Sequence, residues 1–67
     1  MTPLVATTPE ELAAEADRLT KLLRERIVSR VWRHRPSEIG IEFVDGVRLF
    51  IDWREKGFEF SVTGLDE

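Results

Sequence analysis

Apolar and polar residues alternate in two runs that meet at Asp45-Gly46, within the stretch 39–52 that reads IGIEFVDGVRLFID. Alternation with a period of two predicts half-buried strands, and Asp-Gly between two such runs predicts a hairpin. A loop of three residues that ends in a left-handed Gly46 pairs Phe43 with Val47 and brings six alternating apolar side chains to one face. A two-residue loop would divide them between both faces, so we expect the longer loop.

A helix is expected at 9–26, after the sequence Thr-Pro-Glu-Glu at positions 8–11. Thr8 can cap the helix, proline suits the first helical position, and Glu11 can close a capping box. An apolar stripe follows at steps of three and four residues: Leu12, Ala16, Leu19, Leu23 and Ile27. The stripe is short for a coiled coil and a sheet is available to receive it, so we expect it to pack on that sheet.

The stretch 27–35, IVSRVWRHR, alternates poorly and is compatible with either a strand or the end of the helix. The proline that follows stops either element. If the turn pairs Arg35 with Glu38, the apolar face takes Trp32 and His34. The outward side chains would then be Val31, Arg33 and Arg35. We prefer this register because it buries the tryptophan and pairs an arginine with a glutamate.

A last strand is expected at 58–63, FEFSVT, because its apolar residues alternate. The loop at 54–57 contains Gly57, which can supply a positive φ. The register that keeps all apolar side chains on one face pairs Trp53 with Phe58, Ile51 with Phe60, and Leu49 with Val62.

The fold class that follows is α+β, with one N-terminal helix packed on a four-stranded antiparallel meander in the order α-β-β-β-β. Residues 1–67 would form a single small domain. Residues 1–7 are expected to be an irregular lead-in whose Leu4 and Val5 cover one end of the core, and residues 64–67 a frayed tail. The expected core consists of Leu12, Ala16, Leu19, Leu23, Ile27, Trp32, Ile39, Ile41, Phe43, Val47, Leu49, Ile51, Trp53, Phe58, Phe60 and Val62.

Composition limits the classes of protein that fit. A chain of 67 residues has room for one core and is marginally stable unless it packs well or oligomerises. With 42% hydrophobic and 34% charged residues it is not disordered by composition, and without cysteine it has neither disulfides nor a thiolate metal site. No apolar run reaches membrane-spanning length and no signal peptide is evident, so we expect a cytoplasmic protein that does not bind membranes.

Three rows of side chains are expected on the outer face of the sheet, the face turned away from the helix. Glu42 would lie opposite Arg48, and Phe50 opposite Gly40, where an aromatic ring can cover a strand glycine. The first row holds Arg35, Glu38, Asp52 and Glu59; the second Arg33, Gly40, Phe50 and Ser61; the third Val31, Glu42, Arg48 and Thr63.

Carboxylates stand in line in the first row, those of Glu38, Asp52 and Glu59, and they repel one another unless Arg35 or Arg54 lies among them. Oxygen ligands of this kind suit calcium or magnesium, but no EF-hand spacing accompanies them. A catalytic carboxylate pair would need a pocket, which the face of a small flat sheet lacks. We therefore expect no metal and no cofactor, but either a solvated charge ladder or a docking surface for a basic partner.

The sequence has few other residues or motifs that could support catalysis. His34 is the only histidine, no G-x-S-x-G elbow is present, and the glycines are explained by the sheet and its turns. An enzyme built on His34 and the acidic row would lose its turnover in His34→Ala, but we expect this protein not to be an enzyme.

Phe50 is an aromatic side chain on an otherwise charged face, which is the composition of an interaction hot spot with a polar rim. We therefore expect a non-catalytic protein-binding module, of the adaptor or inhibitor type, whose contact tolerates moderate salt. The expected partner-binding residues are Phe50, Arg48, Arg33, Glu42, Asp52, Glu38, Glu59 and Ser61.

The last strand is a further candidate contact, because its only charged residue is Glu59 and it would lie at an open edge. Two such edges could pair to form a homodimer, or the strand of a partner could add there. A small domain with little core gains most from either contact.

Nucleic acid is the alternative partner. The net charge of −3, from 13 acidic and 10 basic residues, argues against it, but seven of the basic residues fall within 18–35. Basic residues at the end of a helix also complement its dipole, so the clustering has a structural explanation. The candidate residues are Arg24, Arg26, Arg30, Arg33 and Arg35, with Trp32 or His34 free to stack on bases if the register preferred above is wrong.

Overall fold

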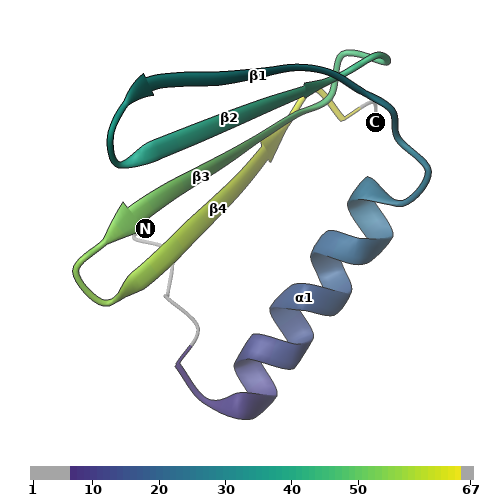
Figure 1. The fold of residues 1–67 in the computed structure, drawn as a ribbon. Coiled ribbons are helices and arrows are strands. Elements are labelled where there is room, and N and C mark those ends of the chain that lie inside the picture. The colour runs from purple at the N-terminus through teal and green to yellow at the C-terminus, as the bar shows by residue number, and fades with distance from the viewer. Residues whose placement is uncertain (1–6, 66–67) are drawn as a thin grey trace.

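A computed structural model describes residues 7–65 as one helix followed by one open antiparallel sheet (Figure 1). The strands lie side by side in chain order, which confirms the α+β class and the order α-β-β-β-β. The elements are α1 (Pro9–Leu23), β1 (Val28–Arg35), β2 (Glu38–Phe43), β3 (Arg48–Arg54) and β4 (Gly57–Thr63). The roles expected for Leu4, for Val5 and for the last two residues of the tail lie outside the described residues.

The start of α1 has the predicted capping box. The Glu11 backbone N–H donates to the Thr8 hydroxyl at 3.1 Å, and the Thr8 backbone N–H donates to the Glu11 carboxylate at 3.0 Å. The helix ends at Leu23, earlier than the expected 26, because Glu25 takes a left-handed conformation with φ 65°. Arg26 then turns back to donate to the Leu22 carbonyl at 2.6 Å, which satisfies an acceptor left free at the helix end.

The hairpin between β2 and β3 has the predicted three-residue loop. The Phe43 N–H donates to the Val47 carbonyl at 2.8 Å, and Gly46, at φ 91°, donates to the Phe43 carbonyl at 3.0 Å. The register then runs as expected along both central strands and on to β4, where Gly57 has φ 141°. The pairs include Ile39 with Ile51, Ile41 with Leu49, Glu42 with Arg48, Trp53 with Phe58, Ile51 with Phe60 and Leu49 with Val62.

β1 is a strand, but its expected register is wrong. Arg35 pairs with Glu38 as predicted, whereas Trp32 pairs with Gly40 instead of lying beside Ile41, because an irregularity between Trp32 and Arg35 adds a residue to β1. A shift of one residue moves a strand's side chains to the opposite face. Trp32 therefore lies on the outer face, and Val31 lies on the face that carries the helix, opposite Ile41.

The core is smaller than predicted. Only Phe43, Val47 and Leu49 are buried among the described hydrophobic residues, and Leu19, Leu23 and five partly buried sheet and tail residues pack against them. No residue of α1 is buried. The core expectation is wrong for six residues: Leu12, Ala16, Ile27, Trp53 and Phe58 are exposed, and Trp32 lies on the outer face. The helix meets the sheet through the end of its stripe and leaves the beginning uncovered.

Candidate functional site

The centre of the outer face is a pair of aromatic rings, Trp32 from β1 and Phe50 from β3, which we call the aromatic platform. Their ring centroids lie 6.2 Å apart and their planes differ by 8°. Both rings lie over Gly40 of β2, the strand between them. A Cβ at that position would lie 2.6 Å from Trp32 Cε3 and 3.3 Å from Phe50 Cε1, so glycine is what allows the rings to lie down on the sheet.

Two arginines flank the platform. The guanidinium carbons of Arg30 and Arg48 lie 5.0 and 5.8 Å from the centroid of the Trp32 ring, within the range of cation–π attraction. Both also bind the Glu42 carboxylate, Arg30 at 3.2 Å to one oxygen and Arg48 at 3.2 Å to the other. Glu42 therefore balances part of the positive charge, and it holds both guanidinium groups beside the tryptophan.

A shallow open cavity of about 240 Å³ lies beside the platform, lined by Trp32, His34, Arg48 and Phe50. His34 Nε2 lies 2.6 Å from Glu38 Oε1, and this contact fixes the ring on the outer face. The expectation that His34 would lie on the apolar face is wrong, for the same reason as for Trp32.

The acidic row has the predicted pairing across the strands, with Glu38 opposite Asp52 and Asp52 opposite Glu59. Arginine side chains lie among these carboxylates. Arg35 Nε lies 3.6 Å from Glu38, and Arg54 donates to Glu59 at 3.2 Å. Within residues 7–65, no group of three or more histidine, cysteine, aspartate or glutamate side chains is arranged to hold a metal ion.

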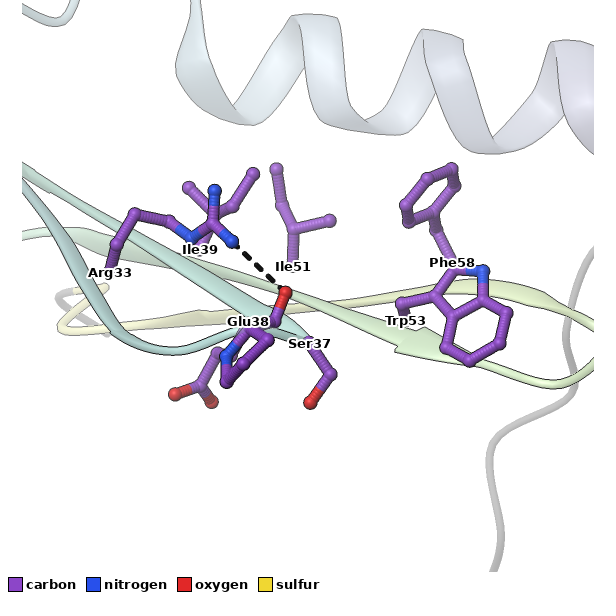
Figure 2. Close-up of a pocket in the computed structure, with 8 residues that line it drawn as sticks. Arg33, Ser37, Glu38, Ile39, Ile51, Trp53 and Phe58 are labelled. Carbon is purple, nitrogen blue, oxygen red and sulfur yellow. Dashed lines mark hydrogen bonds between the residues drawn. The ribbon is translucent and has the colours of Figure 1, made fainter.

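Most of the predicted partner-binding residues do share the outer face. Pairing across β2, β3 and β4 brings together Glu38, Glu42, Arg48, Phe50, Asp52, Glu59 and Ser61. Arg33 does not join them. It lies on the side of the sheet that carries the helix, near Ile39 and Ile51, and donates to the Pro36 carbonyl at 3.0 Å (Figure 2).

The predicted partner-binding set did not include Trp32, Arg30 and His34, which were named as binding residues only for the nucleic-acid alternative and which the structure places on this face. One signal for Trp32 was present in the sequence. A glycine in the middle of a strand can accept aromatic rings from both neighbouring strands, and only the ring on one side, Phe50, was considered.

The five arginines of the nucleic-acid alternative do not form one surface. Arg30 and Arg35 lie on the outer face, and Arg33 lies on the opposite face. Arg26 is partly buried at the helix end, where it binds the Leu22 carbonyl and the Asp45 carboxylate. The chain thus divides its basic residues between both sides of the sheet, although they are close in sequence.

No known protein family, no curated protein and no solved structure matches this chain. No helix among the described residues is both long enough and apolar enough to cross a membrane.

Proposed function

We propose that this protein is a non-catalytic protein-binding module, of the adaptor or inhibitor type, which binds its partner on the outer sheet face around the aromatic platform. The observation that carries the proposal is the stack of Trp32 on Phe50, with Arg30 and Arg48 beside it. Tryptophan, aromatic and arginine side chains are the residues that dominate binding energy at protein interfaces. The two rings remain partly exposed and so offer apolar contact area.

The charges around the platform favour a protein over nucleic acid. Glu42 binds both flanking arginines, and the carboxylates of the acidic row lie on the same face. Phosphate groups would meet these carboxylates at close range, whereas a protein partner can offer both signs of charge. A contact centred on aromatic rings depends little on ionic strength, because salt screens charges and not apolar burial.

A pull-down from cell extract with matched variants tests the proposal. Ser61 is exposed and lies opposite Phe50, so Ser61→Lys alters the outer face without entering the core. Val44 is 66% exposed in the loop between β2 and β3, so Val44→Lys is a control for added charge alone. We expect the wild type and Val44→Lys to retain the same partner protein at moderate salt. Calorimetry with that purified partner should then show that Ser61→Lys binds it at least about tenfold more weakly. Equal binding by all three proteins would contradict the use of this face.

Binding of single-stranded nucleic acid is the second candidate, because Trp32 and His34 are both on the outer face and Arg30 and Arg48 adjoin the tryptophan. Stacking of bases on aromatic rings beside arginines is a common mode of such binding. Titration with a mixed-sequence oligonucleotide distinguishes the candidates, since nucleic-acid binding would fall steeply with salt and weaken in Arg30→Ala.

We propose the edge of β4 as a second contact. β4 is the last strand of the sheet, and Glu59 is its only charged residue. A partner strand, or the same strand of a second copy, could extend the sheet there. The homodimer through this edge and the cytoplasmic location both stay predictions.

A further inference from the structure

A second, separate apolar surface lies on the inner face, the face that carries the helix. Its centre is the pair Trp53 and Phe58, which lie opposite each other on β3 and β4 and are 56% and 55% exposed. Beside them, Ile39 and Ile51 line a cavity of about 270 Å³ (Figure 2). Leu12 of α1, on the stripe that faces the sheet, is 51% exposed. We call these five residues the inner patch.

The patch is open because α1 covers only part of the sheet. Leu19 and Leu23 reach the buried cluster, and close backbone contacts between described elements join only neighbouring strands. Leu12 lies two turns before Leu19 on the same stripe, yet its own side chain is half exposed. Among residues 7–65, the uncovered part of the inner face therefore includes the start of the helix, the β3–β4 end of the sheet, and Val28 and Val31 on β1.

We infer that a second copy of this chain covers the inner patch, in a two-fold symmetric dimer. The exposed area agrees with what a dimer needs. Half-exposed Trp53 and Phe58 each leave about 100 Å² accessible, and the rest of the patch with Val28 and Val31 brings the apolar total to about 500 Å². A homodimer interface of standard size buries about 800 Å² per protomer, of which about 65% is apolar.

The size of the chain explains why the cover is a second copy. A domain of about 60 residues buries only about 60% of its unfolded surface. Below about 70–80 residues a single core rarely supplies more than about 3–5 kcal/mol, and small proteins commonly add disulfides, a structural metal or oligomerisation. This chain has no cysteine, and residues 7–65 hold no cluster of metal-binding side chains. A copy of the same chain is present whenever the protein folds, so self-association is the route that remains.

Two-fold symmetry suits the composition of the patch. In such an interface each surface meets the same surface of the other protomer, so its centre has to complement itself. The apolar and aromatic side chains of the patch do so without pairing like charges. Arg33, which lines the same cavity, donates to the Pro36 carbonyl of its own chain. Trp53 and Phe58 of one protomer would lie against the same pair of its partner. The dimer would leave the aromatic platform on the outer face free, so this inference does not rest on the proposed function.

Light scattering and sedimentation measure the mass directly. We expect a particle of twice the 7.8 kDa chain mass at micromolar concentration. Phe58→Lys and Leu12→Glu change exposed side chains, and each is expected to raise the dissociation constant at least about 100-fold while the circular dichroism stays native. Val44→Lys, which lies in the β2–β3 loop, is the control and should remain dimeric.

Tryptophan fluorescence gives a readout that does not depend on those variants. Trp32→Phe leaves Trp53 as the only tryptophan. Its emission should move to longer wavelength on dilution, as the dimer dissociates and the ring meets water. A monomer at all concentrations would overturn the inference, as would a dimer that resists both patch variants. A dimer that Ser61→Lys alone dissociates would place the contact at β4 and its outer face, and would also overturn it.

Discussion

Trp32 stacks on Phe50 across an intervening strand, with ring centroids 6.2 Å apart and planes 8° apart. The two residues belong to β1 and β3, which have no hydrogen bonds to each other because β2 lies between them. The stack therefore ties together three strands on the outer face, where the helix gives no cover. It also buries Gly40, the residue that lies beneath both rings.

Gly40→Ala should destabilise the protein by about 1–3 kcal/mol, the usual cost of overpacking. The added Cβ would lie 2.6 Å from Trp32 Cε3, so the indole has to move off the sheet and lose its stack on Phe50. Urea unfolding at fixed protein concentration measures the change. Ser61→Ala, in the same row but exposed, should stay within about 0.5 kcal/mol of wild type. A Gly40→Ala protein as stable as wild type would mean that the rings do not lie on the glycine.

A double-mutant cycle measures the stack itself. Trp32→Ala and Phe50→Ala should show a coupling free energy of about 0.5–1.5 kcal/mol, because removal of either ring removes the same contact. The matched cycle of Phe50→Ala with Leu12→Ala, on the other side of the sheet, should be additive within about 0.5 kcal/mol. Comparable coupling in both cycles would argue against a specific contact between the rings.

Glu42→Gln should lower the free energy of unfolding by about 1 kcal/mol. Each exposed ion pair is weak, but the Glu42 carboxylate makes two of them, one with each arginine. The Glu42 side chain is 19% exposed and accepts hydrogen bonds from Arg30 and Arg48. Salt should destabilise the wild type more than the variant, because the variant no longer has the pairs to screen. Glu55→Gln, in the exposed turn after β3, is the control, and an equal effect there would refute this role of Glu42.

Acid should loosen the start of α1. The backbone N–H of Thr8, and then that of Thr7, donate to the Glu11 carboxylate and hold the pKa of this group below its ordinary value of 4.5. Because the folded pKa is lower than the unfolded one, the stabilisation is complete above about 4.5 and is lost as the pH falls through the folded pKa. Helical circular dichroism should therefore fall with acid less steeply in Glu11→Gln than in wild type. An NMR titration that found the Glu11 pKa at or above its unfolded value would contradict the capping geometry.

Local signals in the sequence were enough to predict the element order and every turn whose chemistry is local. Asp45-Gly46 set the β2–β3 loop, and Gly57 set the turn before β4. The capping box of Thr8 and Glu11 set the first turn of the helix. These signals suffice because glycine conformations and caps act over a few residues, and because alternation then fixes which face is buried. Seven of the eight expected site residues reached the outer face for this reason.

The register of β1 and the position of α1 depend on packing between distant parts of the chain. A single extra residue between Trp32 and Arg35 turns Trp32 outward and Arg33 inward, and imperfect alternation in this edge strand gives no local sign of it. The helical stripe likewise predicts which side of α1 is apolar, but not how much of the sheet it covers. The short link from Leu23 to Val28 holds the end of the helix near the buried cluster, and Leu12 and the patch around Trp53 and Phe58 are left exposed. Burial depends on where whole elements lie, and that is decided by the packing of the chain and not by its pattern.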